Sequence, residues 1–220
     1  MEFYLRQVYP WLIEISSFSF VVPLSIGIFI INKSSSLLYK LLLLYVVVIA
    51  LVEMISQLTV YLGTGNNHWI NHVYTPLESL IIGSIYYCYT RSKLYRRAIC
   101  AALLVVLGVS IYSMVWGESL TQMNSFPHTI SAVVLVTMAL IYFYQAAHDL
   151  KHTYLDTDPM FVLSCGIIIY QAGTAMAYSL FNEALAASYD TARICISVIL
   201  VLNILFRVIL AMALNRTAAT

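Results

Sequence analysis

Two acidic residues inside long apolar segments are the residues of this sequence best suited to chemistry. Glu53 and Glu78 each lie within a stretch of mostly aliphatic and aromatic residues. Carboxylates in such segments are costly, and they usually face the interior of a helix bundle or a cavity. Two ionised carboxylates in a low dielectric repel each other, so at least one is expected to hold a proton or bind a cation. This chemistry suits proton sensing, recognition of a cationic or hydrogen-bonding ligand, or a metal site.

Polar residues recur around both glutamates at the spacing of one helical face. The candidate ligand-binding residues on these faces are Glu53, Gln57, Asn71, Tyr74, Glu78, Gln171, Thr174 and Tyr178. Further polar residues that fit the same cavity are Glu14, Ser17, Tyr61, His128 and Ser131. The pattern predicts a polar cavity that opens to the outside, with Glu53, Glu78 and Gln171 as its floor. The alternative is that these groups only hold helices together, as polar residues commonly do in membranes.

The two glutamates are expected at one depth. Glu53 lies ten residues before Gly63, and Glu78 lies nine residues after Trp69. At ~1.5 Å per residue these separations place the carboxylates ~15 Å and ~13 Å below the outer edge of the bundle. The sequence therefore predicts that two carboxylates on consecutive helices share one level.

A basic residue within the last apolar segment is expected to lie elsewhere. Arg207 precedes Leu214 by seven residues, which places it ~10 Å from the inner edge. This depth predicts that Arg207 is too far from Glu53 and Glu78 to meet them. We expect its guanidinium to reach the inner headgroups, or to pair with Asn203 one turn away.

Histidine spacing gives weaker support for a metal. His68 and His72 are four residues apart but begin an apolar segment at the water boundary. His72 and Glu78 differ by six residues and so do not share a helical face. His148 and His152 are also four residues apart, but they lie in a polar loop, where exposure of the histidine side chains to water is the expected state. We therefore predict no metal ligand and no cofactor.

The composition defines the elements that must position these residues. The chain has 220 residues, of which 61% are hydrophobic and only 10% are charged, whereas soluble domains carry about 25% charged residues. Disordered tails, nucleic-acid-binding proteins and disulfide-rich secreted domains are excluded, so a nucleic-acid partner is not expected. The class is an all-α integral membrane protein whose partner is the lipid bilayer. Seven stretches are long enough to span it, at residues 11–31, 37–62, 69–90, 98–116, 126–147, 160–181 and 191–213. The connections are too short for a soluble domain, so residues 1–220 form a single bundle.

Basic residues set the expected orientation. With the N-terminus outside, the inner loops and the tail hold Lys33, Lys40, Arg91, Lys93, Arg96, Arg97, Lys151 and Arg216. Only Arg6 and Arg193 lie outside. By the positive-inside rule this bias predicts a cytoplasmic C-terminus. The densest basic loop, with Arg91, Lys93, Arg96 and Arg97, is either an anchor on an anionic leaflet or a docking patch for a cytoplasmic signalling protein.

One short motif carries a family resemblance. Asn66, Asn67, His68 and Trp69 are followed by Tyr74 and Glu78. This NNxW…Y…E pattern resembles a family of small, uncharacterised bacterial seven-helix membrane proteins. The resemblance implies a multi-pass protein of the bacterial inner membrane, but it implies no activity. The last apolar segment has no lysine for a retinal Schiff base, and the last two have no histidine for a ceramidase-type metal site.

Three functions remain open from the sequence. The first is a receptor-like or sensory bundle with an outward-facing polar pocket, a small-molecule or cation ligand and a separate cytoplasmic partner. The second is a small transporter or a proton or cation channel that uses Glu53 and Glu78. The third is an intramembrane enzyme acting on lipid, which no Ser/His/Asp set, GxSxG or HExxH motif supports. A non-enzymatic role is favoured.

Overall fold

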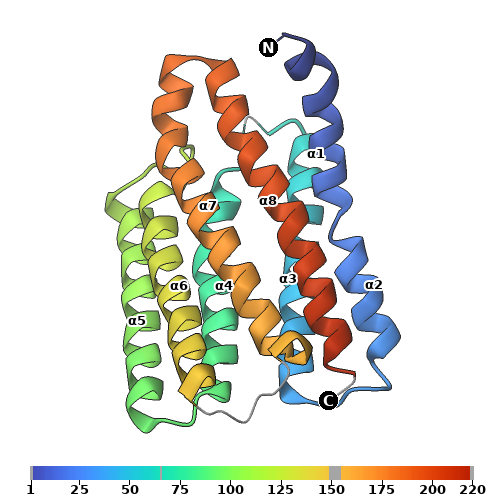
Figure 1. Ribbon diagram of the computed structural model, residues 1–220. Helices are drawn as coiled ribbons and strands as arrows, with labels where there is room; N and C mark the ends of the chain where they lie inside the picture. The colour runs from blue at the N-terminus through green and yellow to red at the C-terminus, as the bar shows by residue number, and fades with distance from the viewer. Residues whose placement is uncertain (1, 65, 149–154, 219–220) are drawn as a thin grey trace.

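The structure, a computed structural model, describes residues 2–64, 66–148 and 155–218, and these contain helices and no strand. The long helices run side by side, and consecutive ones point in opposite directions (Figure 1). The elements are a π-helical turn Tyr4–Val8, α1 Tyr9–Phe18, α2 Val21–Ile30, α3 Leu37–Tyr61, α4 Trp69–Tyr89, α5 Lys93–Trp116, α6 Ser125–His148, a 3-10 turn Leu155–Thr157, α7 Pro159–Ala187 and α8 Tyr189–Arg216. We call the end of the bundle that holds the N-terminus the N-terminal face, and the end that holds the C-terminus the C-terminal face.

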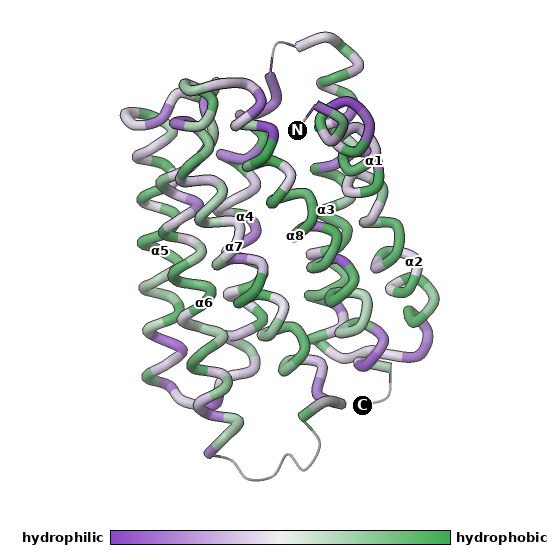
Figure 2. The backbone as a smooth tube through the Cα atoms, turned by 45° about the horizontal axis from the view of Figure 1, so that its top comes forward, coloured by the Kyte–Doolittle hydropathy of each residue, from purple (hydrophilic) through white to green (hydrophobic). Residues whose placement is uncertain are grey.

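The helices have the lengths and the surface of a membrane bundle. Six segments are long and apolar enough to cross a bilayer: Tyr4–Ile30, which includes α1 and α2, and helices α3, α5, α6, α7 and α8. Large apolar side chains face outward along them, such as Phe29, which is 85% exposed. Hydrophobic residues occupy most of the helix middles, and hydrophilic ones gather toward the two ends (Figure 2). The predicted all-α bundle with membrane-spanning helices is confirmed. Six of the seven expected spans overlap these six segments, and the seventh, residues 69–90, overlaps α4.

Helix α4 differs in composition from these six segments. Its 21 residues are ~31 Å long at 1.5 Å per residue, but it is not among the segments that are apolar enough to cross a bilayer. The reason is a row of buried polar side chains, His72, Thr75, Glu78 and Ser79. Helix α4 packs against α3, α5 and α6, so these polar groups are covered by protein.

The first segment is broken, where the sequence pattern predicts one continuous span over residues 11–31. Helix α1 ends at Phe18, and α2 begins at Val21. Pro23 has no N–H to donate to the Ser19 carbonyl, so the regular helical bond is missing there. The Ser19 hydroxyl also donates to the Ser16 carbonyl at 2.7 Å, which stabilises the break.

Glycines allow α7 and α8 to pack closely. A Cβ atom at Gly166 would lie 2.6 Å from Ile209 Cγ2, and one at Gly173 would lie 2.5 Å from Leu202 Cδ1. The two glycines are seven residues apart and so lie on one face of α7. Small residues at such a contact are typical of helix association in membranes. The α7–α8 pair thereby forms a close-packed wall behind the polar groups of the core.

We expect Gly166→Val to destabilise the bundle by about 1–3 kcal/mol, because the new methyl groups would overlap the β-branched Ile209 side chain. Thermal unfolding of the purified protein in detergent measures this loss. The matched control is Gly108→Val, since Gly108 lies on the exposed side of α5 with no atom near its Cβ position. Equal unfolding temperatures for the two variants would contradict close α7–α8 packing.

Candidate functional site

An ion pair buried within the bundle joins α3 to α8. Arg207 Nη2 donates to Glu53 Oε1, and the two side chains are 6% and 19% exposed. This contact corrects the expectation that Arg207 lies too far from Glu53 and reaches the headgroups instead. A guanidinium and a carboxylate at this depth are tolerated because each compensates the charge of the other.

The direction of the side chains explains the correction. Side chains on a helix lean toward its N-terminus. Helix α3 starts at the C-terminal face, so Glu53 leans toward that face, whereas α8 starts at the N-terminal face, so Arg207 leans toward Glu53 (Figure 1). Counting residues along each helix measures only the Cα depth, and it omits both inclinations and the length of the arginine side chain.

Arg207 also binds the break in the first segment. Its Nη1 atom donates to the Ser16 carbonyl and to the Ser19 hydroxyl, the latter at 2.9 Å. The C-terminal end of a helix carries partial negative charge and free carbonyl groups, both of which favour a cation. One guanidinium therefore ties together α1, α3 and α8.

A pocket of about 500 Å³ opens beside this ion pair, between the first segment and α3. Its polar lining is Glu14, Ser17, Glu53, Gln57 and Tyr61, and its apolar lining is Phe18, Phe20, Met54 and Leu58. The polar set consists of residues that helical spacing placed on common faces of the first two predicted spans. The pocket combines two carboxylates with apolar walls, an arrangement that suits a cation with an apolar body.

Glu78 lies in a separate, buried cluster rather than in this pocket. It is 1% exposed, and its Oε1 accepts hydrogen bonds from the Tyr45 hydroxyl at 2.5 Å and the Tyr74 hydroxyl at 3.2 Å. Gln171 approaches the same carboxyl group, but its amide and Glu78 Oε2 do not complete a hydrogen bond of normal geometry. The expected single cavity floored by both glutamates is thus replaced by two neighbouring sites. Tyr170 interacts electrostatically with both glutamates.

Several predicted site residues surround Glu78 from α6 and α7. Gln171 and Thr174 are fully buried. Thr174 Oγ1 lies 3.2 Å from His128 Nε2, and the His128 ring stacks on Tyr178 with centroids 4.0 Å apart. These contacts form a polar core between α6 and α7, in which the Gln171 amide and Glu78 Oε2 complete no hydrogen bond of normal geometry.

Asn71 lies apart from both sites, near the N-terminal face. Its Nδ2 contacts Met123 Sδ at 3.6 Å, and its carbonyl accepts from Asn124 Nδ2 at 3.1 Å. Asn124 has no exposed surface and also donates to the Thr75 hydroxyl at 3.0 Å. The connection between α5 and α6 therefore folds back over α4.

Two residues of the sites were missed by sequence reasoning. Tyr45 holds Glu78, and Ser79 shares a 2.6 Å hydrogen bond with Ser131. Tyr45 lies eight residues before Glu53, which continues the same helical face toward the C-terminal end, so the spacing contained a signal for it. Ser79 directly follows Glu78 and has no such signal.

The histidines near the N-terminal face do not gather with further ligands. His72 Nε2 lies 3.3 Å from the Gln122 carbonyl. Burial and the neighbouring His72 lower the pKa of His68, which precedes α4. Within residues 2–64, 66–148 and 155–218, no group of three or more His, Cys, Asp or Glu side chains is close enough to hold a metal ion. His152, Asp149 and Lys151 lie outside the described residues.

Comparisons with known proteins do not indicate a function, so the proposal below is based on the geometry of the site. No family model, no curated protein and no solved structure matches the chain. The class that fold and site define is therefore a helical membrane bundle with a carboxylate-lined pocket beside a buried ion pair.

We expect Arg207→Leu to destabilise the protein by about 3–5 kcal/mol, because it leaves the Glu53 carboxylate without its positively charged partner inside the bundle. The double variant Arg207→Leu with Glu53→Leu should recover a large part of this loss. Thermal unfolding of the two single variants and the double variant measures the coupling. Additive losses would show that the two side chains do not interact.

Proposed function

We propose that this protein is a receptor-like membrane protein whose pocket at Glu14 and Glu53 binds a small cation with an apolar body. The observation that supports it is the position of the pocket, which adjoins both the buried ion pair and the break in the first segment. Glu14 is exposed and forms no ion pair with another described residue. Of the two carboxylates that line the pocket, only that of Glu53 is paired with a guanidinium, which leaves a net negative charge for the ligand to neutralise.

Competition for Glu53 would convert binding into a conformational change. A ligand ammonium at the pocket competes with Arg207 for the Glu53 carboxylate. A weakened ion pair loosens the three-helix junction that Arg207 holds, because the same guanidinium binds the end of α1. A ligand shifts such an equilibrium by the difference between its affinities for the two arrangements. The break between α1 and α2 is the proposed moving element, and α8 carries the change to the C-terminal face.

The proposed topology has seven crossings, with the N-terminus outside and the C-terminus in the cytoplasm of a bacterium. The length of α4 and the basic bias of the loops at the C-terminal face support it. The NNxW…Y…E motif agrees with a bacterial inner-membrane family. A cytoplasmic partner would bind at that face and respond to the conformational change. The positive charge for this contact comes from Arg91, Lys93, Arg96 and Arg97.

A proton- or cation-transport function is the second candidate. A broken first helix and an acidic residue buried at mid-depth are features that transporters use. A dry layer opposes this function, because fully buried apolar side chains fill the core between Glu78 and the C-terminal face. They are Leu42, Ile82, Leu135, Leu163, Ile167 and Leu210. A transporter would have to open this layer, whereas a receptor would not.

Hydrophobic amines are expected to raise the unfolding temperature of the protein, whereas the corresponding uncharged alcohols should not. Glu14→Gln should weaken amine binding about tenfold or more, because it removes a carboxylate from the pocket without touching Arg207. Thermal-shift titration with a panel of alkyl and aryl amines measures this. Glu183→Gln is the matched control, since Glu183 is exposed on α7 and does not line the pocket. Equal loss in both variants, or equal shifts with alcohols, would contradict the proposed site.

Reconstitution in liposomes separates the two candidate functions. With a pH-sensitive or cation-sensitive dye inside, we expect no flux above that of empty liposomes, because the apolar layer below Glu78 closes the path. Flux that is abolished by Glu53→Gln or by Glu78→Gln would reject the receptor proposal in favour of transport. Amine binding without flux supports the receptor.

A further inference from the structure

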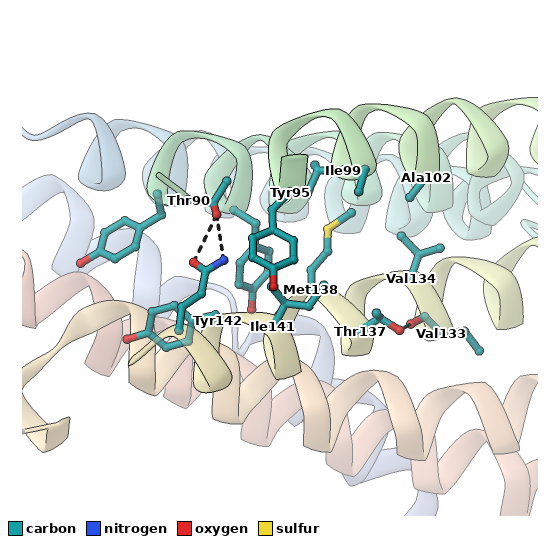
Figure 3. Close-up of a pocket in the computed structure, with 14 residues that line it drawn as sticks. Thr90, Tyr95, Ile99, Ala102, Val133, Val134, Thr137, Met138, Ile141 and Tyr142 are labelled. Carbon is teal, nitrogen blue, oxygen red and sulfur yellow. Dashed lines mark hydrogen bonds between the residues drawn. The ribbon is translucent and has the colours of Figure 1, made fainter. Parts of the chain in front are cut away.

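A second surface lies away from the ion pair, where α5 and α6 separate over α4 near the C-terminal face. It is an apolar groove of about 180 Å³. Figure 3 shows side chains of α5 and α6 facing each other across it, among them Ile99, Ala102, Val134 and Met138. Val133 is 61% exposed at its edge, so the groove opens toward the bilayer rather than into the core.

The groove continues into a polar mouth. An adjoining pocket of about 580 Å³ shares Tyr89, Thr90 and Gln145 with the groove, and it adds Arg91 and Arg96 at the C-terminal face. The apolar groove matches the hydrocarbon chain of an anionic amphiphile, and the two guanidinium groups at the membrane boundary match its charged headgroup.

Contacts within the protein hold the mouth in shape. Arg96 Nε donates to the Thr90 carbonyl at 2.9 Å, and its guanidinium lies 5.4 Å from the centre of the Tyr87 ring. The Gln145 amide donates to the Thr90 hydroxyl at 3.1 Å, which links the end of α6 to that of α4 (Figure 3). These contacts use only part of the donor capacity of Arg96, whose guanidinium has five N–H groups.

The charges around the mouth favour an anion. Among the described residues, no acidic side chain lines the groove or the mouth. Among the described residues, the Asp158 carboxylate bonds to Tyr142, which lines both the groove and the mouth, and Asp158 itself is buried. It accepts from the Tyr142 hydroxyl at 2.5 Å and from the Met160 N–H at 2.9 Å, as the N-cap of α7.

We propose that this groove and its mouth bind one anionic phospholipid of the leaflet at the C-terminal face. One acyl chain lies between α5 and α6, and the headgroup phosphate is bound by Arg91 and Arg96. The dimensions agree, because Val133 and Gln145 are 12 positions apart, which corresponds to ~18 Å along α6. Half of the ~30 Å hydrocarbon core is of similar length. Arginine suits phosphate because its planar donors bind two oxygens at once.

The basic loop contains its own controls. Lys93 and Arg97 belong to the same charge cluster, but they line neither the groove nor the mouth. A diffuse attraction to an anionic surface would depend on all four charges about equally. A built site depends on Arg91 and Arg96. In the same way, Ala102 lines the groove, whereas its neighbour Ala101 is exposed and does not.

The test compares lipid binding to the full-length protein in detergent by native mass spectrometry, with phosphatidylglycerol and phosphatidylcholine of the same chain length. We expect phosphatidylglycerol to bind with a stoichiometry of one and to be preferred. The double variant Arg91→Gln with Arg96→Gln should weaken its binding about tenfold, whereas Lys93→Gln with Arg97→Gln should leave it nearly unchanged. Ala102→Phe, which fills the groove, should weaken binding of the lipid, and Ala101→Phe should not.

Three results would overturn the proposal. They are equal binding of the two lipids, equal losses in the two double variants, and equal effects of the two phenylalanine substitutions. Inorganic phosphate provides a further arm: if millimolar phosphate displaces the lipid, the mouth is a site for free anions instead. If the Lys93 and Arg97 variant alone loses a bound cytoplasmic protein while lipid binding persists, the lipid proposal stands. Thermal unfolding of each variant without added lipid controls for misfolding.

Discussion

The buried guanidinium of Arg207 is the constraint on which the N-terminal half of the bundle depends. A charge removed from water is tolerated only when its donors find partners. Arg207 finds them on two other helices: the Glu53 carboxylate on α3, and the Ser16 carbonyl with the Ser19 hydroxyl at the break of the first segment. At the break the Ser16 carbonyl accepts from the N–H and the hydroxyl of Ser19 within the segment, and Arg207 is its third donor. The break, the ion pair and the pocket beside them are therefore parts of one arrangement.

The two glutamate carboxyl groups are stabilised inside the bundle in different ways. Glu53 is compensated by a full positive charge at the wall of an open pocket, whereas Glu78 is held by tyrosine hydroxyls without exposure to solvent. A carboxylate paired with a movable arginine can exchange partners with an incoming cation. A carboxylate enclosed by side chains from α3, α4 and α7 cannot do so without repacking the core. This difference is why the ligand proposal rests on Glu53 and why Glu78 is assigned to the interior.

Much of the fold and part of the site follow from the sequence. Apolar length predicts the helices to within a few residues at most ends, and helical spacing brings Glu14, Ser17 and Gln57 to the wall of one pocket. The position of Arg207 could not be predicted by counting depth, since its contact depends on the opposite inclination of side chains on antiparallel helices. The break after Phe18 was also missed, because hydropathy reports length and not the loss of a single N–H at Pro23.

The two halves of the bundle have different physical characters. The N-terminal half contains the ion pair and the polar clusters, whereas the C-terminal half is packed with aliphatic and tyrosine side chains. Tyr86 belongs to that dry core and also forms part of the groove between α5 and α6, and its hydroxyl bonds to Ser164 on α7 at 2.9 Å. Because a close-packed interior transmits strain, a lipid in the groove would press on the same layer that lies between Glu78 and the C-terminal face. The proposed groove and the apolar layer below Glu78 therefore share Tyr86, whereas the pocket at the first segment shares no lining residue with the groove.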